Sequence, residues 1–313
     1  MHPKCLTIQN VEVLGGDFPR AWKGVYEGEV VCLKVIRSSS ESNVQALAKE
    51  YMQEAITWSQ LKHPNILPLI GIHFVGEVKV CLVSPWMERG NLVQFLGSAP
   101  REHVDHLSLA SGVASGIAYL HHANMVHGNL KGVNILITTD LKACIGGFGS
   151  LRIVLDLNED DDVYDHPRRS AIRWTAPELL KPETYHVTTT QSDMYAFGCV
   201  CYKIFTRHTP FYNLYEHEVS KAVLYEHRHP SRPVDAGRIL TDVIWEFMAS
   251  FWNHDPSLRP TAVDAIDRIQ HLANSMKRGD IQAAPDWSWF DPEKKHQGNV
   301  EYSPLDLELL FQI

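Results

Sequence analysis

The sequence lacks an excess of basic residues, a paired-cysteine motif and a long apolar run. Its 313 residues carry a formal net charge of −8, from 29 basic and 37 acidic side chains. This balance argues against a nucleic-acid partner, because phosphate backbones attract basic faces. The six cysteines include no Cys-x-x-Cys pair, which argues against zinc and thioredoxin-type chemistry and favours reduced, buried thiols.

No segment has the pattern of a membrane span or a secretion signal. The most apolar stretch, residues 195–205, is shorter than the roughly 20 residues that a bilayer-crossing helix needs. No apolar run follows the first five residues, so a signal peptide is not expected. Together with the cysteine usage, these features predict a cytoplasmic protein without a membrane segment.

The first third of the chain has the pattern of strands with one helix. Residues 29–36 are β-branched and apolar, as in a half-buried strand. Further strands are expected over 11–14, 66–73 and 78–84. Before the helix-ending sequence His-Pro-Asn at 63–65, apolar residues at spacings of three and four indicate one helix face. These residues are Val44, Leu47, Tyr51, Ala55 and Trp58.

Helical patterns dominate from about residue 91 onward. Thr261 and Asp264 form a capping box that predicts the start of one helix. The apolar positions expected to be buried in three helices are Val113, Ile117 and Leu120; Ile239, Val243, Phe247 and Phe251; and Val263, Ile266, Ile269 and Leu272. The order of patterns predicts an α+β architecture, in which a small β-rich unit joins a larger helical unit near residues 85–90.

Several motifs follow one another in a fixed order. The two most informative are His-Gly-Asn-Leu-Lys-Gly-Val-Asn at 127–134 and Gly-Gly-Phe-Gly at 146–149. The others are Val31-Cys32-Leu33-Lys34, Glu54 nine residues before His63, Ala176-Pro177-Glu178, the segment 192–198 and the segment 255–260. In this order they resemble the protein kinase superfamily, and their wording is similar to tyrosine-kinase-like Ser/Thr kinases, including those of mushroom-forming fungi.

The resemblance implies a bilobal protein-kinase fold. The kinase domain is expected over residues 1–276, with an N-lobe at about 1–86 and a C-lobe at about 90–276. The N-lobe would hold a β-sheet and one C-helix, and the C-lobe would be mainly helical. Residues 277–313 lose the periodic pattern and are expected to form a C-terminal tail outside the fold.

The resemblance also implies an ATP site with an altered glycine loop. Its three glycine positions read Leu14, Gly16 and Pro19, and proline offers no N–H to a phosphate. Lys34 and Glu54 would form the ion pair that positions the α- and β-phosphates. The other residues implied around the adenine are Cys32, Ser84, Pro85, Met87 and Leu136. We therefore expect weak ATP binding.

Both acidic groups of phosphoryl transfer are missing from the implied catalytic site. Asn129 stands at the position of the catalytic base, and losing a general base commonly costs roughly 10²–10⁴-fold in rate. Gly147 stands at the position of the metal-binding aspartate. Asn134 keeps one amide oxygen, a poor ligand by itself, so Mg²⁺ is not expected. Lys131 would reach the γ-phosphate but, with no base beside it, would bind the phosphate without transferring it. Gly128 replaces the arginine that pairs with an activation-loop phosphate, which disfavours that form of switching.

The scaffold around this site is expected to be intact. Asp193 would hold the backbone of the catalytic loop, and Glu178 would pair with Arg259. A hydrophobic stack that links the lobes would contain Leu69, Trp58, Phe148 and His127.

These features predict a pseudokinase that acts as a protein-interaction or signalling scaffold, with a kinase or another signalling protein as its partner. One alternative is a slow, atypical Ser/Thr kinase that transfers the γ-phosphate of ATP to protein hydroxyls. Its base would then be an acid of the activation segment, Asp156 or the run 159–162. A further alternative is a switch in which metal-free ATP sets the arrangement of the lobes.

Overall fold

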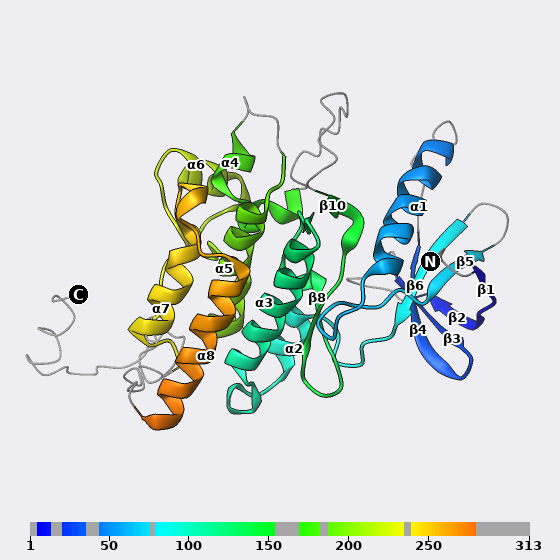
Figure 1. Ribbon diagram of the computed structural model, residues 1–313, viewed down its shortest axis with the longest axis horizontal. Helices are drawn as coiled ribbons and strands as arrows, with labels where there is room; N and C mark the ends of the chain where they lie inside the picture. The colour runs from blue at the N-terminus through cyan, green and yellow to red at the C-terminus, as the bar shows by residue number, and fades with distance from the viewer. Residues whose placement is uncertain are drawn as a thin grey trace, which may run out of the picture.

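A six-stranded sheet forms the N-terminal lobe of the computed structural model, which describes residues 5–13, 21–35, 44–75, 79–153, 169–181, 187–234 and 239–279. The strand order is β1-β5-β6-β4-β3-β2, with β1 parallel to β5 and the other pairs antiparallel. The strands are β1 (Cys5–Leu6), β2 (Gln9–Val13), β3 (Ala21–Tyr26), β4 (Glu29–Val35), β5 (Gly71–Val75) and β6 (Lys79–Pro85). The helix α1 (Val44–Gln60) lies beside this sheet (Figure 1).

The alternation of side chains along β4 gives the sheet two different faces. Val31 and Leu33 are fully buried in a cluster that also holds Leu6 and Val83. Successive strand residues point to opposite faces, so Lys34, next to Leu33, belongs to the other face. The strand therefore builds a small core with one set of residues and presents the other set to the site.

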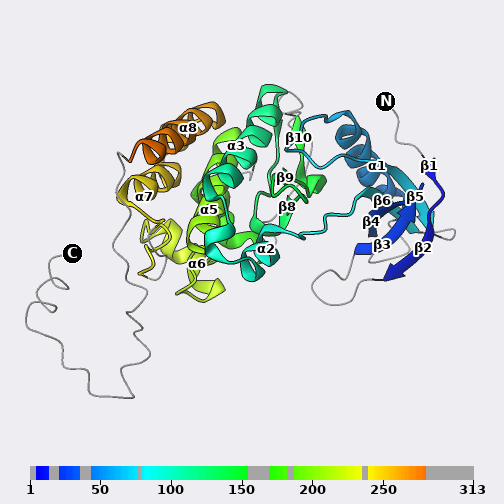
Figure 2. The same ribbon diagram turned by 90° about the horizontal axis from the view of Figure 1, so that it is seen from below.

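The C-terminal lobe is mainly helical (Figure 2). Its helices are α2 (Leu92–Ser98), α3 (His106–His122), α4 (Pro177–Leu180), α5 (Thr190–Thr206), α6 (Glu216–Leu224), α7 (Asp242–Ala249) and α8 (Ala262–Arg278). Two short antiparallel pairs join β7 (Met125–Val126) to β10 (Arg152–Ile153) and β8 (Ile135–Ile137) to β9 (Ala143–Ile145). The 3₁₀ turns are η2 (Arg101–His103), η3 (Gly132–Asn134), η4 (Phe148–Ser150), η5 (Arg169–Trp174), η6 (Ser250–Trp252) and η7 (Pro256–Leu258). The predicted bilobal α+β fold is thus confirmed.

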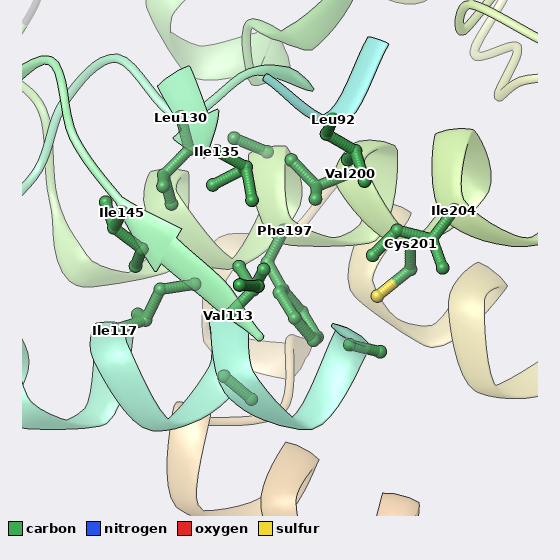
Figure 3. Packing of buried hydrophobic residues seen from close by; sticks show 14 of the residues in the cluster. Leu92, Val113, Ile117, Leu130, Ile135, Ile145, Phe197, Val200, Cys201 and Ile204 are labelled. Atoms are coloured by element: carbon green, nitrogen blue, oxygen red, sulfur yellow. The ribbon is translucent and has the colours of Figure 1, made fainter. Parts of the chain in front are cut away.

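Helix α5 is the centre of the C-lobe core, because every residue from Ser192 to Thr206 is buried. Figure 3 shows Phe197 and Val200 of α5 among side chains of neighbouring elements, including Val113 of α3. A helix that is apolar on all sides is a buried helix. This explains the apolar stretch seen in the sequence. Among the described residues, no helix is both long and apolar enough to cross a membrane.

Two predicted helix faces were partly wrong. In α7 the buried residues are Ile244, Phe247 and Met248, whereas Val243 is 44% exposed and Ile239 precedes the helix, which begins after its cap Thr241. A step of four residues turns a helix by about 400°, so a strict four-residue repeat leaves its face by about 40° at each step.

In α8 the error concerns Val263, which is 61% exposed. Small residues, Ala262 and Ala265, take the buried face with Ile269 and Leu272. Alanine is a weak signal in an apolar pattern, so the pattern pointed to Val263 and not to its buried neighbour Ala262. The predicted capping box is confirmed, since Thr261 and Asp264 each accept the other's backbone N–H.

The segment 66–73, predicted as a strand, is a strand only from Gly71 onward. Its first part instead connects the lobes. The N–H of Leu67 donates to the carbonyl of Ile145 in β9 (2.8 Å), and Asn65 Nδ2 donates to the carbonyl of Ala143 (2.8 Å). One continuous hydrophobic cluster accordingly contains residues of both lobes.

The ion pair of Glu178 and Arg259 fixes the end of the activation segment to the helical lobe. The two guanidinium ends of Arg259 donate to the two carboxylate oxygens at 2.7 Å each. The Arg259 side chain is fully buried. Its remaining N–H groups reach the carbonyls of Asn253 (2.8 Å) and Gln191 (3.0 Å). The pairing predicted from the sequence is therefore present.

We predict that Arg259→Ala lowers the free energy of unfolding by about 3–5 kcal/mol, because it leaves a carboxylate and two carbonyls without their donor. Arg268→Ala, which removes an exposed guanidinium from α8, is the matched control and should cost less than about 1 kcal/mol. Urea denaturation followed by circular dichroism measures both. Equal losses of unfolding free energy in the two variants would show that the buried ion pair stabilises the fold no more than an exposed arginine does.

Candidate functional site

The ion pair between Lys34 of β4 and Glu54 of α1 is formed. Lys34 Nζ lies 2.7 Å from Glu54 Oε1, and the side chains are 41% and 5% exposed, respectively. The pair holds α1 against the sheet. Glu54 also lies against Gly149, where an added Cβ would be 3.4 Å from its carboxylate. The C-helix therefore contacts the loop that follows Gly147.

An aromatic stack connects α1 to the catalytic loop. The ring of Phe148 lies 5.3 Å from Trp58 and 5.6 Å from His127, measured between centroids. Trp58 also donates its indole N–H to the carbonyl of Leu67 (2.5 Å), and the partly buried Leu69 packs against the same core. The stack predicted from the sequence is thus assembled across both lobes.

Asp193, on the first turn of α5, organises the catalytic loop. Its carboxylate accepts the backbone N–H groups of His127 (2.8 Å) and Gly128 (2.9 Å). It also lies 3.0 Å from His121 Nε2 of α3. The backbone contacts were predicted, whereas His121 was not, because a histidine on a helix 72 residues away carries no local sequence signal.

His127 is fully buried and uncharged. Burial lowers the pKa of its imidazole. Its Nδ1 accepts the N–H of Asn129 (3.2 Å), which leaves Nε2–H to donate to the carbonyl of Gly146 (3.0 Å). A neutral histidine thus joins the catalytic loop to the loop that contains Gly147.

Asn134 and Gly147 approach each other more closely than two side chains could. Asn134 Nδ2 donates to the carbonyl of Asn129 at 2.7 Å. Gly147 has a left-handed backbone (φ +81°). A Cβ placed on it would lie 2.6 Å from Asn134 Cγ, 2.7 Å from Oδ1 and 2.8 Å from Nδ2. The amide of Asn134 therefore fills the space in which a side chain at position 147 would begin.

The side chains at positions 129, 134 and 147 offer a magnesium ion no carboxylate, since Asn129 and Asn134 carry neutral amides and Gly147 has no side chain. Mg²⁺ is usually held by one or two carboxylates together with substrate phosphates, so the expectation that it does not bind stays a prediction. Asp140 is exposed in the turn between β8 and β9. Asp156 and the acidic run at 159–162 lie outside the described residues, so a role for them stays a prediction.

The residues expected around adenine come from β4, from β6 and the lobe connection that follows it, and from β8. Cys32 is opposite Ser84 in the β4–β6 register, and Ser84 is buried. Burial raises the pKa of the Cys32 thiol to about 11, so it stays protonated at neutral pH. Pro85 ends β6, Met87 packs against the core and Leu136 lies in β8. Gly16 and Pro19 are outside the described residues.

Gly128 and Lys131 are two further predicted residues of the catalytic loop. Gly128 has φ +71°, and a Cβ there would be 2.9 Å from the carbonyl oxygen of Ser150. Glycine thus suits this position. Lys131 directly precedes the turn η3 that carries Asn134. Lys131 has interactions of its own with the protein, and its expected contact with the γ-phosphate stays a prediction.

The family described as protein tyrosine and serine/threonine kinase matches residues 8–269, and the chain belongs to it. The chain is 32% identical over 270 residues to the tyrosine-protein kinase Srms of Mus musculus, covering 82% of this chain and 51% of that protein. It is 28% identical over 269 residues to the tyrosine-protein kinase Abl of Drosophila melanogaster, covering 82% of this chain and 15% of Abl.

A plant relative matches over a similar length. The serine/threonine/tyrosine-protein kinase HT1 of Arabidopsis thaliana is 26% identical over 271 residues, covering 84% of this chain and 66% of HT1. The chain thus spans only part of the length of each of these relatives. The family and its kinase fold are established by these matches, and they extend over both lobes.

We predict that Gly147→Ala lowers the free energy of unfolding by about 1–3 kcal/mol. A left-handed backbone costs a non-glycine residue about 1–2 kcal/mol, and the new Cβ must displace Asn134 from its bond to Asn129, worth about 1 kcal/mol. Gly28→Ala is the control, because Gly28 has φ +84° and nothing within 4 Å of an added Cβ.

Thermal and urea denaturation of both variants measure the difference. The Asn134→Ala/Gly147→Ala double variant should lose less stability than the sum of its single changes, because the colliding amide is gone. If Gly147→Ala costs no more than Gly28→Ala, Asn134 does not occupy this space in solution.

Proposed function

We propose that this chain is a pseudokinase of the tyrosine-kinase-like Ser/Thr group: a kinase fold that binds a protein partner and does not transfer phosphate. The observation that carries the proposal is the arrangement of Asn129, Asn134 and Gly147. A neutral amide at position 129 cannot accept the proton of a substrate hydroxyl. The metal-binding position has no side chain, and the Asn134 amide fills the adjoining space.

The retained contacts support a stable scaffold. The ion pair of Lys34 and Glu54, the stack around Phe148 and the carboxylate of Asp193 are all assembled. None of these contacts requires a proton to move or a metal to bind. The fold thus keeps the contacts that hold its shape and has lost the groups that would perform the chemistry.

Nucleotide binding, in this proposal, is weak and independent of Mg²⁺. The Lys34 side chain is 41% exposed at the site and can offer a positive charge to a phosphate. Without a metal, the charge of the triphosphate is left uncompensated, since kinases rely on Mg²⁺ to neutralise it. ATP is then at most an occasional ligand of the scaffold.

The proposal also covers the partner, the domain limits and the location of the protein. Its partner is a protein, a kinase or another signalling protein, and its acidic charge of −8 disfavours nucleic acid. We assign the kinase domain to residues 1–276 and the tail to 277–313, and we place the protein in the cytoplasm.

We predict that the purified protein, incubated with ATP and Mg²⁺, incorporates no more phosphate into itself or a general protein substrate than its Lys34→Met variant does. The missing base and metal ligand act on one transition state, so their losses combine. Radiolabelled γ-phosphate provides the measurement. Incorporation that depends on Lys34 would overturn the proposal and favour a slow kinase with an acid from the activation segment.

Calorimetric titration of ATP separates the scaffold from a nucleotide switch. We expect the same weak affinity in EDTA and in excess Mg²⁺, with a further loss in Lys34→Met. If Mg²⁺ strengthens ATP binding tenfold or more, a metal site exists and the proposed closure by Asn134 is wrong.

A further inference from the structure

Three cationic side chains converge at the carboxyl end of α5, where α2 packs beside it (Figure 2). Arg207 caps α5 with a left-handed backbone (φ +69°). The Nζ of Lys203 donates to the carbonyl of Arg207, and Arg101 Nη2 lies 3.5 Å from the carbonyl of Thr206. The three charges are thus brought together on one short stretch of backbone.

The guanidinium of Arg207 uses only part of its hydrogen-bonding capacity. Its Nη1 donates to the carbonyls of Leu96 and Ala99, both at 2.7 Å, at the end of α2. Its Nε and Nη2 are buried and have no hydrogen-bond partner in the structure. A buried donor without an acceptor costs about 1–3 kcal/mol, so a native site of this kind calls for an additional group.

The unpartnered atoms form one edge of the guanidinium. The N–H groups of Nε and Nη2 point in parallel, which is the geometry that meets the two oxygens of a carboxylate or phosphate. A carboxylate or a phosphate can meet the two donors with a separate oxygen for each. The free edge of Arg207 therefore suits an anion with two oxygens.

The cations of this region act on one another. Burial and the nearby Arg207 lower the pKa of Lys203, and burial and Arg101 lower that of Arg207. His106 is only 5% exposed, and its Nε2 has no hydrogen-bond partner in the structure. Its pKa is lowered to about 4, first by burial and then by the two arginines.

The acidic groups nearby offset this charge only in part. Glu102 and Asp105 are the acids that act on Arg207 and His106, respectively. Asp105 already accepts the N–H of Ser108 as the cap of α3 (2.9 Å). Neither acid is bonded to the free edge of Arg207.

Helix capping explains some of these contacts but not all of them. Cations at the carboxyl end of a helix are stabilised by its dipole and by its last carbonyls. Capping accounts for Nη1 of Arg207, for Lys203 and for Arg101, each of which meets a carbonyl. It does not account for the Nε–Nη2 edge, which meets no acceptor.

We propose that the Nε–Nη2 edge of Arg207, with Lys203 and Arg101 beside it, binds a phosphate group. The ligand is either free phosphate or a phosphate carried by the side chain of a phosphorylated protein. Because the edge is covered in the structure, an entering phosphate displaces side chains that cover it. The site needs neither ATP nor phosphoryl transfer, so it goes beyond the proposed function and does not depend on it.

The test compares thermal stability in phosphate and in chloride at equal ionic strength. Arg207→Gly removes the edge and keeps the left-handed backbone, which glycine adopts readily. Arg207→Lys keeps the charge and loses the paired donors. Arg228→Gln, at an exposed cation outside the cluster, is the control for net charge. Circular dichroism verifies that each variant is folded before titration.

We expect phosphate to raise the melting temperature of the wild type and of Arg228→Gln in a saturable way, with binding at least tenfold weaker in both Arg207 variants. Broadening of the ³¹P resonance of inorganic phosphate should follow the same order. A saturable response that persists in Arg207→Gly, or a wild type that responds no more to phosphate than to chloride, overturns the proposal.

O-phosphoserine and O-phosphotyrosine distinguish the two sources of the phosphate. Tighter binding of either amino acid than of inorganic phosphate identifies a phosphorylated side chain as the ligand. Equal or weaker binding identifies the free ion. None of these titrations involves Lys34 or ATP, so their failure leaves the pseudokinase proposal untouched.

Discussion

The carboxylate of Asp193 is the constraint on which the site depends. It is 2% exposed and is held inside the lobe by α5, whose residues from Ser192 onward are all buried. From there it fixes the backbone at His127 and Gly128. Because His127 in turn bonds to Gly146 and packs on Phe148, one buried charge sets the position of both loops. Such a buried charge is tolerated because it is hydrogen-bonded, here to the N–H groups of His127 and Gly128 and to His121.

The same geometry explains how the proposed pseudokinase can keep its fold without acids at positions 129 and 147. The loops are positioned by the N–H groups and carbonyls of the backbone, together with His127 and Asp193. The side chain at position 129 makes none of these contacts, and Gly147 has no side chain to make one. A neutral residue at each position therefore leaves the packing intact, and the Asn134 amide fills the space beside Gly147.

Much of the fold and site could be predicted from sequence because motif order fixes which residues meet. The pairs Lys34–Glu54 and Glu178–Arg259 were identified in this way. The approach of Asn134 to Gly147 could not be predicted, since it depends on the placement of two backbones to within an ångström. Ala262 and Ala265, which share the buried face of α8 with the predicted Ile269 and Leu272, were missed for a different reason: alanine can pack closely against a neighbour, but its small side chain adds little to an apolar pattern.

The stack of Trp58, Phe148 and His127 has a consequence for control. It is complete in the polypeptide by itself, as is the ion pair that positions α1. A ligand shifts an equilibrium only by binding one state better than another. In the proposed scaffold, a partner that binds these assembled lobes therefore needs no nucleotide to arrange them first.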